Sequence, residues 1–154
     1  MYDILLPIHS LFRWLVLLSL LYSIYLSARG YCQGWQFSVD HDRIRHWTAT
    51  IAHIQLVLGI LLYTKSITVK AYFSGLVDSA ARMESLFFGI IHISSMLIAI
   101  VLITIGSAKA KRKKESNEKF KTMLIWFSIA LLIIILAIPW PFSPLANRPL
   151  IRNY

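Results

Sequence analysis

Four long apolar segments limit the folds open to this chain. A bilayer core of about 30 Å requires about 20 apolar residues in a helix that rises about 1.5 Å per residue. Hydrophobic residues make up 57 % of the 154 residues, more than an ordinary soluble domain contains. The sequence therefore predicts an all-α integral membrane four-helix bundle, formed by one domain over residues 1–154, with helices at approximately 4–26, 44–63, 85–106 and 120–140.

The connections carry further signals. Gly30 and Gly34 are expected to end the first helix. Residues 64–85 form the longest connection, and their mildly amphipathic pattern predicts a short interfacial helix on the outer side. After the fourth helix, an extended C-terminal tail is expected because prolines rule out helical continuation at Pro139, Pro141, Pro144 and Pro149.

The formal net charge of +9 is distributed asymmetrically between the two ends of the predicted bundle. Ten of the sixteen Lys and Arg residues fall in or beside loops 28–43 and 107–119, five lie toward the opposite side, and Arg13 lies inside the first helix. The positive-inside rule then places these two loops in the cytoplasm and both termini on the outer, periplasmic side. A basic surface beside anionic lipid headgroups accounts for the charge, so no nucleic-acid partner is expected.

Histidines within the apolar segments are the main functional signal, because an unpartnered polar group in hydrocarbon costs several kcal/mol. His53 and His92 each lie near the middle of their segments, which are adjacent and antiparallel. We expect the two imidazoles to face each other at similar depth, the arrangement that the axial ligands of one b-type haem require. The alternative is a structural role, in which they form interhelical hydrogen bonds with Thr50, Gln55, Ser94 or Ser95.

His9 and Arg13 lie one turn apart in the first helix and predict a polar pocket near the outer face. Such a pocket would hold a haem propionate, a quinone carbonyl or a lipid phosphate; alternatively, Arg13 extends to the interface and His9 lies there. His46 is a further candidate for cofactor binding. It shares a helical stripe with His53 but is about 10 Å away along the axis, beside basic residues, which favours an interfacial position.

Other metal centres fit the pattern less well. Zinc and di-iron sites combine histidine with carboxylates or thiolates, whereas every acidic residue here lies at or beyond a predicted helix end. The single cysteine, Cys32, offers no C-x-x-C-H motif for covalent haem. One non-covalent haem b is therefore the expected cofactor, with His53 and His92 as its metal ligands.

Five stretches of the chain also carry a family resemblance: HSLFRWLVL, RHWTATIAHIQLVLGILLY, FFGIIHISSMLIAIVLITIGSAKAKRKK, KFKTMLIWFSIALLIIILAIPWPF and NRPLIR. They resemble, over nearly the whole chain, small four-helix bacterial membrane proteins commonly labelled cytochrome b. The resemblance implies a multi-pass protein of the bacterial inner membrane that carries non-covalent haem and exchanges electrons with quinones. It favours His53 and His92 as axial ligands, with His9 and His46 as alternates.

Two functions of different classes follow, and a small permease with its polar pocket around His9 and Arg13 is a third, weaker option. The first is a single-haem membrane electron carrier, with quinone as its candidate redox partner, rather than a stand-alone enzyme. The second is a cofactor-free structural or assembly subunit of a larger inner-membrane complex, in which the histidines bond between helices. For either function we expect membrane lipids and other membrane-complex subunits as partners.

Overall fold

The computed structural model describes residues 2–75, 77–78, 81–143, 146 and 148. Helices are the only regular elements in this part of the chain, and no strand is found there. In chain order they are α1 (Tyr2–Gln33), α2 (Val39–Lys65), α3 (Ile67–Ser74), α4 (Arg82–Leu86), the π-helix η2 (Phe87–Ile91), α5 (His92–Arg112) and α6 (Ser116–Ala137).

Four stretches are long and apolar enough to cross a membrane: Ile4–Gln33, Val39–Lys65, Arg82–Arg112 and Ser116–Ala137. The third joins α4, η2 and α5 into one continuous rod. The predicted all-α, four-span membrane fold is confirmed at this level, and the protein is a multi-pass membrane protein.

The first helix is longer than predicted. It continues through Gly30, where the ring of Phe120 lies so close that an added Cβ would collide with it. It ends before Gly34, whose φ of 64° is a left-handed conformation that favours glycine. Of the two expected stop signals, only Gly34 therefore acts as one.

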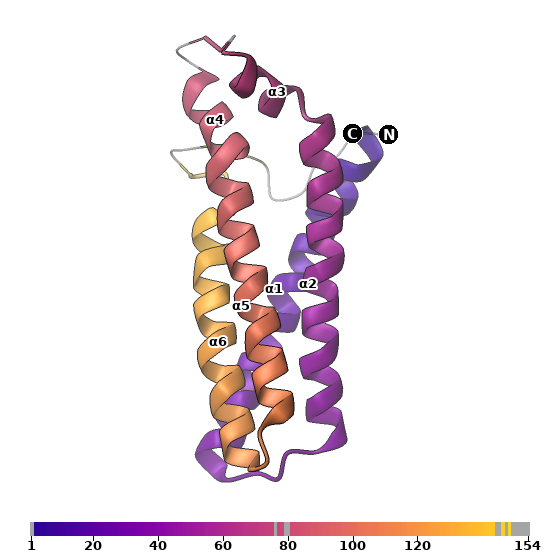
Figure 1. Cartoon of the computed structure of the whole chain (residues 1–154), viewed down its shortest axis with the longest axis vertical. Helices are drawn as coiled ribbons and strands as arrows, with labels where there is room; N and C mark the ends of the chain where they lie inside the picture. The colour runs from indigo at the N-terminus through magenta and orange to yellow at the C-terminus, as the bar shows by residue number, and fades with distance from the viewer. Residues whose placement is uncertain (1, 76, 79–80, 144–145, 147, 149–154) are drawn as a thin grey trace.

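The four long rods form a bundle in which neighbours alternate in direction (Figure 1). α1 packs against α2 and α6, and α5 packs against the same two helices, so α1 and α5 are diagonal to each other. The short connections 34–38 and 113–115 lie together at one end, which we call the basic end because the ten clustered Lys and Arg residues lie at or near it. The start of α1, α3 and α4 lie at the opposite, distal end.

Small residues let the helices approach closely in the middle of the bundle and in its half toward the basic end. Leu20, Ile103 and Phe127 are completely buried between the rods. Gly106 of α5 lies directly under Trp126 of α6, with no space for a Cβ. Close backbone approach of this kind is how membrane helices gain packing energy in the absence of a hydrophobic driving force.

The distal end contains the predicted short helix. α3 lies within the long connection, with Val69 buried and with Ile67 and Phe73 exposed. Its position at a membrane interface stays a prediction.

α6 ends at Ala137, three residues before the predicted end at 140, because Pro139 prevents continuation. Trp140 and Phe142 then stack with ring centroids 6.0 Å apart. Pro144 and Pro149 lie outside the described residues, so the extended tail stays a prediction.

Candidate functional site

A cavity of about 190 Å³ lies in the distal half of the bundle. All four rods, α3 and the segment after α6 contribute to its lining, which is mostly apolar. Its polar wall includes His9 and Arg13 from α1, Gln55 and Tyr63 from α2, and His92 from α5. The volume is more than ten times the roughly 10–15 Å³ that one water needs, so an organic group can enter.

His92 is held by its backbone and by its ring. It follows η2 directly, and its N–H bonds to the carbonyl of Phe87, five residues earlier. Such π-turns occur frequently at functional sites. The ring Nδ1 is 2.8 Å from the Ala137 carbonyl of α6, which only accepts, so Nδ1 carries the hydrogen and donates it. The lone pair of the neutral ring is therefore on Nε2.

His9 contacts α2 through Gln55 and Gly59. The Gln55 amide donates to the His9 carbonyl at 3.0 Å, and its Nε2 is also 3.3 Å from His9 Nε2. The ring lies over Gly59, where an added Cβ would be 3.3 Å from His9 Cε1. Glycine at this position therefore allows the imidazole to pack against the α2 backbone.

Two polar atoms of this wall are buried without a hydrogen-bond partner among the described residues: His9 Nδ1 and Gln55 Oε1. Because Gln55 Nε2 is a donor, the shared contact makes His9 Nε2 an acceptor and places the ring hydrogen on Nδ1. An unsatisfied buried group typically costs about 1–3 kcal/mol. A molecule in the cavity that bonded to these two atoms would remove this cost.

Arginines add positive charge at two places in the lining. Arg13 lies 3.5 Å from the Ser10 hydroxyl and 5.5 Å from the centre of the Trp14 ring. Arg148, after α6, pairs with Glu84 of α4 and lies 5.3 Å from the Phe88 ring centre. The predicted polar pocket around His9 and Arg13 is thus present as a cavity.

His53 does not line this cavity. Its Nε2 is 2.9 Å from Thr104 Oγ1, whose own hydrogen goes to the Ile100 carbonyl at 2.7 Å, so His53 Nε2–H is the donor. Thr104 lies twelve residues beyond His92 on the same rod, a rise of about 18 Å. The structure therefore does not place His53 and His92 face to face at one depth, as the sequence analysis expected.

Side-chain direction contributes to this separation, and the rings also turn to different partners, His53 to α5 and His92 to α6. A helical side chain leans toward the N-terminus of its own helix. α2 starts at the basic end and α5 follows the opposite direction, so His53 leans toward the basic end and His92 toward the distal end. α1 and α5 start at the same end, and their histidines, His9 and His92, share the distal cavity instead.

His46 is also outside the cavity. It is exposed, and its ring lies 6.2 Å from that of the exposed Trp47, near the basic end. This position agrees with the interfacial interpretation and places His46 far from the polar wall.

Sequence reasoning missed Tyr63 and the Ala137 carbonyl as parts of the site. The Tyr63 hydroxyl donates to the Gly89 carbonyl in η2 at 2.8 Å, which ties α2 to the turn that precedes His92. A tyrosine near a helix end suits a membrane interface equally well, and a backbone carbonyl leaves no mark in the sequence.

Within the described residues, no three His, Cys, Asp or Glu side chains gather as a metal site. The cavity therefore offers two imidazoles, an amide and nearby guanidinium groups as its chemistry. This chain has no match among known protein families, curated proteins or solved structures.

Proposed function

We propose that this protein is a membrane electron carrier that binds one haem b in the distal cavity, with His92 and His9 as the axial ligands. The observation that carries the proposal is that two imidazoles from diagonal helices line one cavity. This pair replaces His53 and His92. The resemblance to the proteins labelled cytochrome b points to the same cofactor.

The donor set would suit this cofactor, although the present volume of the cavity is smaller than a porphyrin. His92 donates Nδ1–H to a backbone carbonyl, the support that commonly orients a metal-binding histidine and leaves Nε2 for the metal. His9 would supply the second imidazole, and its Nε2 lone pair, which now accepts from Gln55 Nε2, would have to turn to the metal. Among the described residues that line the cavity there is no Asp or Glu to compete. Arg13 has the charge to pair with a propionate. When bound, haem supplies one-electron redox chemistry, and the chain's residues set its orientation and its apolar surroundings.

A quinone head group is the second candidate, and the size of the cavity favours it. A volume of about 190 Å³ is close to the ~150 Å³ of an engineered cavity that holds benzene, so one ring fits without movement of the helices. The buried His9 Nδ1–H would donate to a quinone oxygen, and Gln55 Oε1 and His92 Nε2 would accept from quinol hydroxyls. A whole porphyrin requires the helices to separate.

A reduced-minus-oxidised absorption spectrum of the detergent-purified full chain tests the assignment. We expect a Soret band that shifts on reduction and that falls at least tenfold in His92→Ala and in His9→Ala. His53→Ala is the matched control, since it removes an imidazole outside the cavity, and it should keep the band.

The other outcomes are distinct. Loss of the band in His53→Ala, with the band kept in His9→Ala, would place the haem elsewhere. Colourless protein that retains extractable quinone, lost in His9→Ala, would select the second candidate. Colourless protein without quinone would favour the cofactor-free subunit, in which the bonds from His53 to Thr104 and from His92 to Ala137 hold helices together.

We also propose that the basic end faces the cytoplasm of a bacterial inner membrane, as the charge asymmetry predicts. Cys32 is exposed near the end of α1, at the basic end, and is the single cysteine in the chain. A membrane-impermeant maleimide added to spheroplasts should therefore leave it unlabelled until the membrane is opened. Labelling of intact spheroplasts would reverse the orientation.

A further inference from the structure

The π-helix η2 changes which side chains share one face of the rod formed by α4, η2 and α5. In an α-helix each residue turns by about 100°, so side chains five residues apart would point about 140° away from each other. Phe87 and His92 are five residues apart, yet their ring centroids lie 5.8 Å from each other. The bond from the His92 N–H to the Phe87 carbonyl closes the wider turn that allows this contact. Because of η2, Phe87 is buried at 1 % exposure while His92 lines the distal cavity.

Contacts with other elements are needed to hold η2 in place, because π-helices are rare and α-helical bonding is open to the same residues. Two such contacts meet at the buried Gly89. The Tyr63 hydroxyl of α2 donates to the Gly89 carbonyl at 2.8 Å. The Tyr72 ring of α3 packs on Gly89, where an added Cβ would be 2.8 Å from Tyr72 Cδ1. The contact of Tyr63 is a directed hydrogen bond to the backbone of η2, whereas that of Tyr72 is van der Waals packing.

The direction of His92 determines what its ring is able to bind. Its Nδ1–H donates to the Ala137 carbonyl of α6 at 2.8 Å, which leaves the Nε2 lone pair for the cavity. If residues 87–91 returned to α-helical bonding, His92 would rotate relative to Phe87 by roughly the 100° of one residue. Either the ring would then leave the Ala137 carbonyl or Phe87 would leave its buried position.

We propose that Tyr63 is a positioning residue of the distal cavity. Its hydroxyl holds η2 as a π-turn, and this turn keeps His92 Nδ1 on the Ala137 carbonyl and His92 Nε2 available to the cavity. Tyr63 thus acts on a bound group through His92. Its effect on ligand binding rests on the proposed function, whereas its effect on the direction of His92 is measurable in the protein without a ligand.

Nitrogen-15 NMR of the full chain, labelled at histidine, purified in detergent and stripped of ligand, tests this role. The signals of His92 are assigned by their absence from His92→Ala. In Tyr63→Phe we expect the His92 Nδ1–H to exchange with water about tenfold faster than in the wild type, the effect of losing one hydrogen bond of ordinary strength. Tyr72→Phe is the matched control, because it removes a hydroxyl from the other ring at Gly89 and should leave the exchange rate unchanged.

The same spectra contain an internal reference. The His53 Nε2–H donates to Thr104 outside the cavity, so its exchange rate should be the same in the wild type and in Tyr63→Phe. Equal acceleration at His53 and His92 would overturn the positioning role, since it would report a general loosening of the bundle.

Ligand content gives a separate reading. Where the wild type holds haem or quinone, Tyr63→Phe should lose it severalfold and Tyr72→Phe should keep it. A wild type without either ligand would contradict the proposed function, while faster exchange at His92 alone would still support the role of Tyr63. Unchanged exchange at His92 in Tyr63→Phe would overturn that role, and a fall in ligand content would then mean that the hydroxyl contacts the ligand directly.

Discussion

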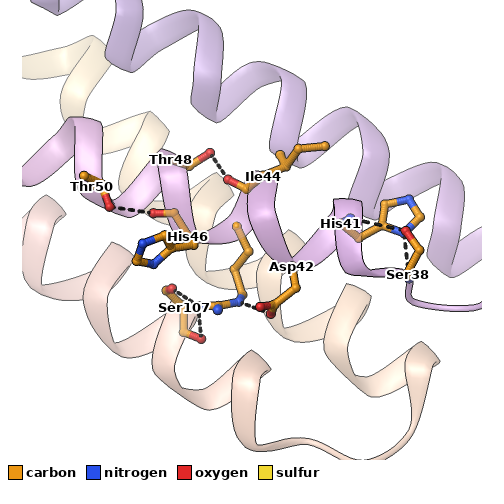
Figure 2. A network of polar contacts seen from close by, with 9 residues as sticks. Ser38, His41, Asp42, Ile44, His46, Thr48, Thr50 and Ser107 are labelled. Carbon is orange, nitrogen blue, oxygen red and sulfur yellow. Dashed lines mark hydrogen bonds and ion pairs between the residues drawn. The ribbon is translucent and has the colours of Figure 1, made fainter.

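The two ends of the bundle differ in whether their buried polar groups have hydrogen-bond partners. At the basic end, Arg45 is 4 % exposed, yet its guanidinium bonds to Asp42 at 2.8 Å and to the Ser107 carbonyl at 3.1 Å (Figure 2). In the same half of the bundle, Ser23 and Thr48 share a hydrogen bond of 2.6 Å between α1 and α2. At the distal end, His9 Nδ1 and Gln55 Oε1 are buried without such partners among the described residues.

This difference distinguishes polar groups that are hydrogen-bonded within the fold from polar groups that remain available to a ligand. A satisfied network stabilises the fold and gains little from a further molecule, whereas an unsatisfied wall costs stability until something binds. We therefore expect substitutions at the basic end to change stability alone. Substitutions that remove the unsatisfied groups at the distal end should raise stability and weaken ligand binding.

The largest expected effect is at the basic end. Arg45→Leu removes hydrogen bonds that join α2 to α5 and leaves Asp42 without its cation, so unfolding in mixed micelles should require about 2–3 kcal/mol less. Arg45→Lys should lose less, because it keeps the charge but not the fork of donors. Haem or quinone content per folded protein should stay at the wild-type value; its loss would show that the two ends are coupled.

At the distal end we expect a gain in stability. The double variant His9→Leu/Gln55→Leu replaces both unsatisfied groups by apolar ones. The free energy of unfolding of the ligand-free protein should therefore rise by about 1–2 kcal/mol. Ligand content should fall at least tenfold. Thermal unfolding of protein stripped of its ligand gives the comparison, and a lower melting temperature would mean that the wall contributes to folding.

A smaller effect is expected where His9 packs against α2. Gly59→Ala adds a Cβ that would lie 3.3 Å from His9 Cε1, so the ring must move by a few tenths of an ångström. We expect ligand affinity to fall about three- to tenfold while stability changes by less than about 1 kcal/mol. Titration of the stripped protein measures the affinity; Gly34→Ala is unsuitable as a control because its φ is positive.

The smallest effect concerns one bond of the satisfied network. Ser23→Ala removes a partner of Thr48, which still bonds to the Ile44 carbonyl at 2.8 Å. The expected loss is about 0.5–1 kcal/mol in unfolding free energy, without any change in ligand affinity. An affinity change as large as that of Gly59→Ala would contradict the separation of the two ends.

Much of the cavity's chemistry was predictable from single residues. His9, Arg13 and His92 are polar groups in apolar segments, and the sequence analysis selected all three. Their grouping was predicted less well, because hydropathy gives the depth of a Cα but not where its side chain ends. His53 and His92 lean in opposite directions on antiparallel helices and bond to different helices, so the expected pair does not form.

By itself, the sequence determined the four membrane spans and their alternation, because bilayer thickness sets the length of an apolar helix and short polar connections force neighbours to alternate. It also marked the residues too polar for lipid. Only the tertiary structure decided which of them meet: the rotation of each rod, the π-turn before His92 and the diagonal placement of α1 and α5 depend on packing between helices. Those contacts form between segments far apart in the chain, and no local pattern records them.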